Sequence, residues 1–239
     1  MDLVVDVGNT AVKLAVYQNA VPIAQASFHV VSDREMTAWI GQFDLRRSML
    51  VSVISPPENL VEYMRSFTDF HVFDDKTPLP VNNAYSTPAT LGKDRLVNAC
   101  AAASLYPQQD VLIIDAGTCL KFDLVTSDGR YHGGSIAPGL VMRFEALHYY
   151  CLALPRVEPE GESPLVGNST FTSIRSGVLN GIAAEISGMV MRYRAEYPGV
   201  HVVLTGGDTD TLVNRLQKDI FAVPGLTLHG LHAILSNLP

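Results

Sequence analysis

The 239-residue sequence has few cysteines and no long apolar run. Its three cysteines, Cys100, Cys119 and Cys151, are scattered and form no C-x-x-C pair. This spacing excludes a zinc site built on cysteine and is typical of a reducing compartment. No apolar run approaches the roughly 18 residues that cross a bilayer, and no charged segment followed by a cleavable apolar stretch opens the sequence. We therefore expect a cytoplasmic protein with no membrane partner.

Basic residues are also scarce. The 17 Lys and Arg residues are outnumbered by 24 Asp and Glu residues, which gives a net charge of −7. No Lys- or Arg-rich stretch offsets this charge locally, so we expect no nucleic-acid partner. An anionic substrate would need a local basic site. With 47% hydrophobic and 17% charged residues, the chain can fold as one large or two small domains.

The sequence contains one motif that occurs twice. Near the start, an apolar run leads into Asp6-Val7-Gly8-Asn9-Thr10 and then into a second apolar run. Halfway along, the same order recurs around Asp115-Ala116-Gly117-Thr118. The two aspartates lie close to half a chain length apart. The repeat predicts a duplicated domain, with one copy in residues 1–108 and the other in residues 109–239.

The chemistry of the repeated turn points to a phosphate ligand. An aspartate at the end of a buried strand is costly to desolvate unless it meets a cation, water or donors. Gly8 and Gly117 allow close approach of the backbone, and turn N–H groups can form an anion-binding concavity. One such turn could equally be an ordinary hairpin, because D-x-G is common. Two matched copies favour a clamp for a nucleotide polyphosphate, with the turns facing each other across a cleft.

The hydrophobic pattern predicts an α/β protein in which β-β-β-α-β-α occurs twice. In the first half we expect strands at 2–8, 11–18, 22–30, 49–54 and 70–73, helices from a capping box at Ser32, at 56–67 and at 93–105, and an irregular segment at 74–92. In the second half we expect strands at 111–118, 120–126, 130–136, 202–205 and 226–229, helices at 140–150, 170–197, after an N-cap at Asp208 and at 231–237, and an irregular loop at 155–168. The glycines of the 170–197 helix predict close helix packing.

Four motifs occur in a specific order: Asp6 to Thr10, Gly92-Lys93-Asp94-Arg95, Asp115 to Thr118, and Gly133 to Leu140. Ser169-Thr170, Arg175-Ser176-Gly177 and Thr205-Gly206-Gly207-Asp208 support them. With these motifs the chain resembles type III pantothenate kinases of the actin/hexokinase/Hsp70-like superfamily. The resemblance spans almost the whole chain. It implies an actin-like ATPase fold of two duplicated ribonuclease-H-like domains, each with a central mixed sheet.

The resemblance also implies an activity, which is the ATP-dependent phosphorylation of pantothenate to 4'-phosphopantothenate, the first step of coenzyme A biosynthesis. It implies ATP, magnesium and a monovalent cation, potassium or ammonium, as cofactors, and a homodimer as the assembly. Asp94 would be the general base and Asp115 the cation ligand. The implied phosphate-binding residues are Asp6, Val7, Gly8, Asn9, Thr10, Ala11, Val12, Lys13 and Thr118. The implied pantothenate-binding residues are Tyr85, Gly92, Lys93, Asp94, Arg95 and Thr170.

The residues themselves are compatible with this chemistry. Phosphoryl transfer depends mostly on positioning and charge stabilisation, and Asp94 can accept a hydroxyl proton. Arg95 offers a donor fork suited to a carboxylate. An Asp-Arg pair is also a routine helix start, and only the other motifs favour catalysis. The chain departs from the family pattern at Lys93 and at Cys119-Leu120-Lys121, where small residues are common. Lys121 could lie near the phosphates or point to solvent.

Two other functions deserve weight. One is a non-catalytic regulatory or accessory protein that keeps the nucleotide-binding fold. The other is a further phosphotransferase of the superfamily, such as a sugar kinase or a polyphosphate phosphatase. A degenerate binder has no reason to retain Asp6, Asp94 and Asp115 together, and the chain is short for a sugar kinase. The pattern therefore favours the pantothenate kinase.

Overall fold

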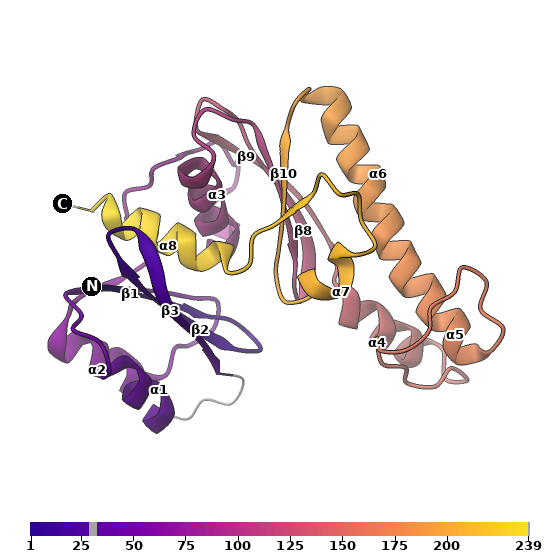
Figure 1. Cartoon of the computed structure of the whole chain (residues 1–239), viewed down its shortest axis with the longest axis horizontal. Coiled ribbons are helices and arrows are strands. Elements are labelled where there is room, and N and C mark those ends of the chain that lie inside the picture. The colour runs from indigo at the N-terminus through magenta and orange to yellow at the C-terminus, as the bar shows by residue number, and fades with distance from the viewer. Residues whose placement is uncertain (29–32, 239) are drawn as a thin grey trace. The chain divides into compact units, whose positions relative to one another are not determined.

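The computed structural model describes residues 1–28 and 33–238, which form two compact units. The first unit comprises Met1–Pro107, Gly129–Tyr131 and Gly225–Pro239, and the second comprises Gln108–Asp128 and His132–Pro224. Figure 1 shows how the elements of each unit are arranged. The units are interleaved along the chain. The predicted division of the repeat at residue 108 stays a prediction.

The first unit is built on a five-stranded mixed sheet in the order β3-β2-β1-β4-β5. Its strands are β1 (Asp2–Val7), β2 (Val12–Gln18), β3 (Val21–Phe28), β4 (Arg47–Ser52) and β5 (Asp69–Val72). β1 and β2 form an antiparallel hairpin, whereas β4 and β5 run parallel to β1. The strands predicted in this half are confirmed within two residues at their described ends, and residues 29–30 of the predicted third strand lie outside the described residues. The predicted cap residue Ser32 lies outside the described residues.

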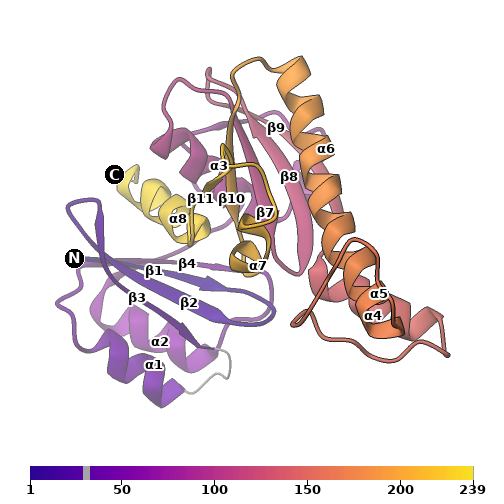
Figure 2. The ribbon, with the colours of Figure 1, turned by 45° about the vertical axis from the view of Figure 1, so that its right-hand side comes forward.

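Two pairs of helices cover the two faces of this sheet (Figure 2). On one face, α1 (Asp33–Ile40) and α2 (Glu58–Phe67) bury Met36, Ile40, Leu60 and Met64 against alternate residues of β1 and β2. On the other face, α3 (Lys93–Leu105) and α8 (Leu226–Ser236) lie side by side and bury Val97, Cys100, Leu231 and Leu235. Both faces are therefore apolar, and every central strand reads as a nearly continuous hydrophobic run.

The predicted strand at 226–229 is wrong, because these residues form the first turn of α8. The sequence Leu226-Thr227-Leu228-His229 alternates as a strand does, but Leu228, Leu231 and Leu235 recur at helical spacing and are buried. The helical period extends over the whole segment, and the alternation covers only four residues. Gly225, in the left-handed conformation with φ of +70°, starts the helix.

Helices α3 and α8 approach each other closely at Gly230. A Cβ built on Gly230 would overlap the carbonyl oxygen of Val97 and lie 2.8 Å from Val97 Cγ1. Nearby, the Thr227 hydroxyl donates to Asn98 Oδ1 at 2.9 Å. Glycine is required here because the α8 backbone rests directly on that of α3. The position of α3 in the first unit therefore depends on α8.

A second mixed sheet of six strands, in the order β11-β10-β7-β8-β9-β6, belongs mostly to the second unit. Five of its strands are β7 (Val111–Ala116), β8 (Cys119–Val125), β9 (Arg130–Pro138), β10 (His201–Thr205) and β11 (Phe221–Ala222). β7 and β8 repeat the antiparallel hairpin of the first unit, and β10 runs parallel to β7.

The predicted irregular segment 74–92 contains only the short strand β6 (Asn82–Asn83) and the 3₁₀ turn η1 (Pro88–Thr90). β6 pairs with Arg130 and Tyr131 at the start of β9.

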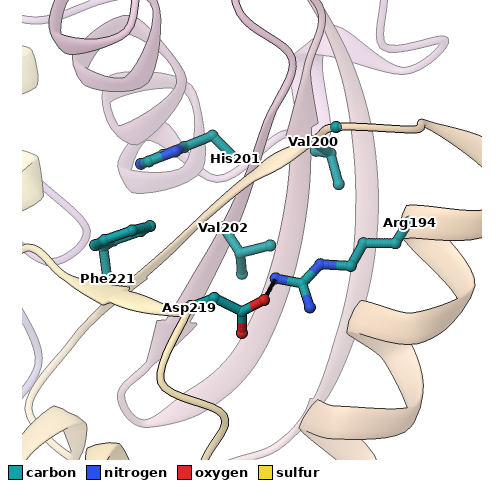
Figure 3. A pocket seen from close by; sticks show the side chains of 7 residues that line it. Arg194, Val200, His201, Val202, Asp219 and Phe221 are labelled. Carbon is teal, nitrogen blue, oxygen red and sulfur yellow. Dashed lines mark ion pairs between the residues drawn. The ribbon is translucent and has the colours of Figure 1, made fainter.

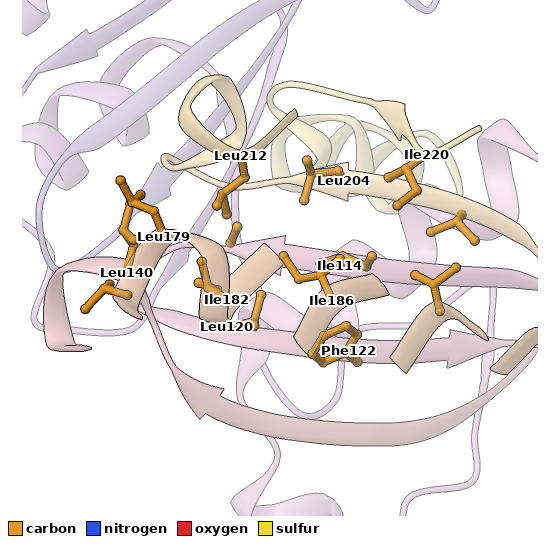
Figure 4. Packing of buried hydrophobic residues seen from close by; sticks show 14 of the residues in the cluster. Ile114, Leu120, Phe122, Leu140, Leu179, Ile182, Ile186, Leu204, Leu212 and Ile220 are labelled. Atoms are coloured by element: carbon orange, nitrogen blue, oxygen red, sulfur yellow. The ribbon is translucent and has the colours of Figure 1, made fainter. Parts of the chain in front are cut away.

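A long helical stretch covers one face of this sheet. It comprises α5 (Thr170–Arg175), the π-helical turn η2 (Ser176–Asn180) and α6 (Gly181–Glu196). Its Leu179, Ile182 and Ile186 pack on sheet residues such as Ile114, Leu120 and Leu204 (Figure 4). The unit also contains α4 (Leu140–Tyr150) and α7 (Thr209–Val213). No helix of the described residues is long and apolar enough to cross a membrane.

The close packing predicted from the glycines of this long helix is wrong. Cβ atoms built on Gly177, Gly181 and Gly188 meet nothing within 4 Å among the described residues. The hydroxyl of Ser176 donates to the Leu165 carbonyl at 2.9 Å and accepts from Asn180 Nδ2 at 3.1 Å, so polar contacts surround the π-helical turn.

Candidate active site

The second repeated turn, Asp115 to Thr118, lies where β7 ends and β8 begins. Two other segments of the second unit close around it. A Cβ on Gly139 would overlap the carbonyl oxygens of Gly117 and Thr118, and a Cβ on Gly206 would overlap that of Ala116. Gly206 also has a φ of +100°, which only glycine adopts without strain. Three chain segments thus meet at one edge of the sheet through backbone contacts, and Thr118 remains exposed there.

Asp208 belongs to this meeting point. Its backbone N–H donates to the Ala116 carbonyl at 2.9 Å, and its carboxylate accepts a hydrogen bond from the N–H of Leu140 at the start of α4. Asp208 stands at the N-cap position of α7, as predicted, but its side chain makes no capping bond to that helix. Burial and the negative charge of Asp115 raise the pKa of Asp208 above its ordinary value, while the Leu140 bond opposes the shift.

Asp115 is paired with Lys121. The two residues stand directly opposite in the β7–β8 ladder, and Lys121 Nζ lies 2.7 Å from Asp115 Oδ2. Each side chain is only 13% exposed. Lys121 therefore does not point away into solvent, which was one of the two expectations for it. Among the described residues, no group of three or more His, Cys, Asp or Glu side chains could hold a metal ion.

The first repeated turn joins β1 to β2 in the first unit. The Gly8 N–H donates to the Ala11 carbonyl at 3.0 Å and closes the turn. Val7 and Val12 are buried in the core beneath it, so only their backbone groups can reach a ligand. Asn9 and Thr10 are exposed at its tip. Lys13 stands opposite Asp6 in the ladder, in the same register as Lys121 opposite Asp115.

Five of the predicted substrate-binding residues come together at the start of α3. A Cβ on Gly92 would come within 2.7 Å of Asp94 Oδ1, so glycine makes room for that carboxylate at the helix N-terminus. Arg95 is 4% exposed, and its guanidinium carbon lies 5.5 Å from the ring centre of Tyr85. Tyr85 in turn faces Tyr131, with 6.3 Å between ring centres. This arrangement places an acid, a fixed cation and an aromatic face within one unit, and Lys93 begins the same helix turn.

The sixth predicted substrate-binding residue, Thr170, lies in the second unit. It is the first residue of α5, which Ser169 and Thr172 cap reciprocally. Thr170 lines a cavity of about 790 Å³ together with the residues Leu147, Leu154, Gly167, Asn168, Ser169, Ser173, Ile174 and Gly177. The lining combines hydroxyl and amide groups with apolar ones, which suits a small polar molecule with an aliphatic part.

A second cavity, of about 440 Å³, lies elsewhere in the same unit (Figure 3). Arg194 and Asp219 form an ion pair of 2.8 Å beside it, and the rings of His201 and Phe221 stack at 4.8 Å. His201 begins β10, whereas Asp115 ends the parallel neighbour β7. The cavity is therefore at the opposite end of the strands from the Asp115 turn. None of the predicted site residues lines it.

Comparison with known proteins decides the family. The sequence profile of type III pantothenate kinases matches residues 2–192. The chain belongs to the type III pantothenate kinase family. It is 41% identical to a type III pantothenate kinase of Phocaeicola vulgatus, over 99% of this chain and 98% of the relative. It is 39% identical to one of Bacteroides fragilis, again over 99% and 98%.

The fold of this type III pantothenate kinase family member also matches solved structures. An activator of 2-hydroxyisocaproyl-CoA dehydratase from Clostridium difficile, solved with bound ADPNP, aligns with a TM-score of 0.55 at 12% identity, over 98% of this chain and 94% of that one. The predicted α/β class and the actin-like ATPase fold are confirmed.

The sequence pattern did not single out two residues that pack at the Asp115 turn, Asp208 and Gly139. Both lie in motifs that carry the family resemblance, Thr205 to Asp208 and Gly133 to Leu140. The sequence signal that could have found Asp208 is its place after a strand. Thr205 ends a strand parallel to β7, and parallel strands bring their carboxyl ends to the same edge of a sheet. Asp208 then follows Thr205 by only three residues.

Proposed function

We propose that this chain transfers the γ-phosphoryl group of ATP to the terminal hydroxyl of pantothenate, giving 4'-phosphopantothenate and ADP. This is the first step of coenzyme A biosynthesis. The observation that carries the proposal is the family match over residues 2–192, together with Asp6, Asp94 and Asp115 at the ends of β1, α3 and β7 where the motifs require them.

Asp94 is the proposed general base. The pantothenate hydroxyl oxygen attacks the γ-phosphorus, the bond to the β–γ bridging oxygen breaks, and the hydroxyl proton passes to the Asp94 carboxylate. Because the transition state of phosphoryl transfer is loose, the base mainly orients the hydroxyl and accepts the proton late. Gly92 leaves space beside Asp94 Oδ1, which supports a substrate hydroxyl at that oxygen.

ATP is the proposed phosphoryl donor, and a divalent metal ion accompanies it as in other kinases. The turn groups suit its phosphates, since the amides and hydroxyls from Asp6 to Lys13 and at Thr118 are donors. We assign the phosphates to these residues, with Val7, Ala11 and Val12 contributing backbone only. Mg²⁺ usually keeps several waters when it is bound, and the Asp6 carboxylate at the first turn would accept hydrogen bonds from them.

Pantothenate is the proposed acceptor. Its carboxylate pairs with the guanidinium of Arg95, which lies against Tyr85, and Lys93 adds positive charge at the same turn. A fork of fixed donors suits a carboxylate better than a flexible ammonium does. Thr170 contributes a hydroxyl from the cavity at the start of α5. These groups supply the local basic site that a chain of net charge −7 needs.

The finer expectation of a potassium or ammonium ion at Asp115 meets an obstacle. Lys121 Nζ lies 2.7 Å from Asp115 Oδ2, so a free monovalent cation competes with this ammonium for the same oxygen. The side chains around Asp115 therefore do not fit that cation, and no step of the proposed reaction runs through it.

A homodimer in the cytoplasm is the proposed setting. Large apolar side chains on and after α4 are mostly exposed in the second unit: Tyr149, Tyr150, Leu152, Leu165 and Val166. Contiguous exposed apolar side chains are typical of protein interfaces, and they border the Thr170 cavity through Leu147, Leu154 and Gly167. Equilibrium sedimentation of the purified protein tests the assembly, and a monomer at every concentration would contradict it.

The activity is tested by incubating the purified protein with ATP, magnesium and pantothenate and identifying the product by mass spectrometry. We expect ADP and 4'-phosphopantothenate in equal amounts. Asp94→Asn should lower kcat by about 10²- to 10⁴-fold, the usual contribution of a general base, at an unchanged melting temperature. Asp75→Asn, in an exposed loop, is the matched control and should retain full activity. ATP binding without any product would favour the non-catalytic accessory protein instead.

A further inference from the structure

The ion pair between Lys121 and Asp115 occupies the position where the family resemblance expects a free cation. The two residues are cross-strand partners in an antiparallel ladder, so their side chains project from the same face of the sheet. The Nζ–Oδ2 distance of 2.7 Å is that of a charge-assisted hydrogen bond. The β7–β8 hairpin itself therefore delivers a positive charge to the aspartate of the turn.

This pair is well shielded from water. Both side chains are 13% exposed, and Ile114, Ala116 and Leu120 beside them are fully buried or nearly so. Removing one member of such a pair leaves the other charge poorly solvated. A free cation placed at Asp115 would also face the Lys121 ammonium, which is a like charge. Both effects favour the lysine over an exchangeable ion.

The surrounding charge explains why a cation is needed at this place. The carboxylate of Asp208 is close enough for Asp115 to act on it, so two acids lie beside the turn that carries Thr118. A triphosphate would add further negative charge. Among the ion pairs of the described residues, the positive side chain that contacts Asp115 is that of Lys121.

We propose that the Lys121 ammonium replaces the free monovalent cation at Asp115, so that this chain needs neither potassium nor ammonium for activity. A lysine ammonium is a compact point charge with three N–H donors, and it is chemically an ammonium ion attached to the chain. The inference rests on the proposed kinase function and specifies which cation serves its phosphate site.

The first repeat supplies an internal comparison. Lys13 occupies the same register opposite Asp6 as Lys121 does opposite Asp115. Lys13 belongs to the proposed phosphate-binding turn, where no exchangeable monovalent cation is expected. The two lysines therefore share their place in the hairpin and differ in the role that we assign to them, which makes Lys13 the matched control.

The test measures the wild-type protein and three variants in choline, sodium, potassium and ammonium chloride at equal ionic strength. The initial rate and the melting temperature with bound ADP are recorded in each salt. Wild type should differ less than about twofold in rate among the salts, with the same melting temperature. Lys121→Met should lose about a hundredfold in choline, as removal of one charge-stabilising group does, and regain activity with ammonium or potassium. Lys121→Ser, which leaves more room for an ion, should behave alike.

Lys13→Met should be slow in every salt, with no rescue by ammonium or potassium. The ADP-bound melting temperature should rise with potassium or ammonium only in the two Lys121 variants, because an ion that binds only the folded state stabilises it. This second readout does not depend on turnover and also reports whether the variants fold.

Activation of the wild type by potassium or ammonium of about fivefold or more, or a rise in its melting temperature specific to these ions, would overturn the inference. Lys121 variants that remain inactive and gain no stability from either ion would overturn it as well. A wild type that forms no phosphopantothenate in any salt would refute the proposed function instead, and the melting temperatures would still decide whether Lys121 excludes the cation.

Discussion

The contact between α8 and α3 yields a prediction whose size can be worked out from the structure. Gly230 is the point of closest approach, and Gly230→Ala adds one methyl group there. The added Cβ would overlap the Val97 carbonyl oxygen and come within 2.8 Å of Val97 Cγ1, whereas ordinary contact begins at 3.4 Å. The carbonyl belongs to a helix backbone and cannot rotate away as a side chain could. The two helices must therefore move apart.

Two opposing effects set the size of the change. Overpacking of a well-packed core costs about 1–3 kcal/mol, and the upper end applies here because main chain meets main chain. Alanine regains about 1 kcal/mol over glycine in a helix interior. The net expectation is a loss of about 2 kcal/mol, which for a chain of this size lowers the melting temperature by roughly 4–8 °C. Because α3 carries Asp94, kcat should fall together with the stability.

The measurement is a thermal melt followed by circular dichroism, with turnover assayed well below the transition. Gly188→Ala in α6 is the control, since a Cβ there meets nothing within 4 Å among the described residues. It should leave stability unchanged or raise it by up to about 1 kcal/mol. If Gly230→Ala melted like the control, the close approach of α8 to α3 would be refuted.

Three further predictions concern the binding groups and the pH dependence of stability. Arg95→Met should raise the KM for pantothenate about tenfold to a hundredfold, as loss of a hydrogen bond to a charged group does. The KM for ATP should stay constant, and equal changes in both KM values would contradict a contact between Arg95 and the pantothenate carboxylate. Gly139→Ala should raise the KM for ATP, because its Cβ would push on the Gly117 and Thr118 carbonyls, and an unchanged KM would remove this junction from the nucleotide site. Burial lowers the pKa of His229 and of His232 below the ordinary value of 6.5, and for His232 the nearby Asp2 opposes the shift. The folded state thus disfavours their protonation, so stability should be complete above pH 6.5 and fall as the pH drops below it. Denaturant unfolding between pH 7.5 and 5.5 measures this slope, and a His229→Gln, His232→Gln protein should show a flatter one; an equal slope would exclude these histidines as its source.

Much of the fold could be predicted from the sequence, because its signals are local. The hairpins around Asp6 and Asp115 consist of apolar runs that end at a glycine turn, and their strands lie where the pattern predicted. Helix α3 was predicted at 93–105 from Pro107 and the apolar spacing before it, and it spans Lys93–Leu105. Such elements need no knowledge of distant contacts.

The errors arose where distant residues decide the structure. The start of α8 alternates like a strand, and its packing on α3 selects the helix. Asp208 is a residue type that usually caps helices, and it stands at the N-cap of α7. Its carboxylate nevertheless accepts a hydrogen bond from the N–H of Leu140, which is far away in the sequence. Gly230 gave no sign of its role, while the glycines of the long helix suggested a contact that the described residues do not make. The pairing of Lys121 with Asp115 depended on a register that the sequence alone leaves open.

The place of α8 in the first unit has a consequence for biosynthesis. Residues 1–107 leave the ribosome long before residues 225–238 are made, and until then Val97 and Cys100 lack the leucines that cover them. A domain usually folds as it emerges, but this one must wait for a segment synthesised after the entire second unit. Ribosome-bound chains halted before residue 225 should therefore expose an apolar surface that holding chaperones bind, and release should coincide with the last helix.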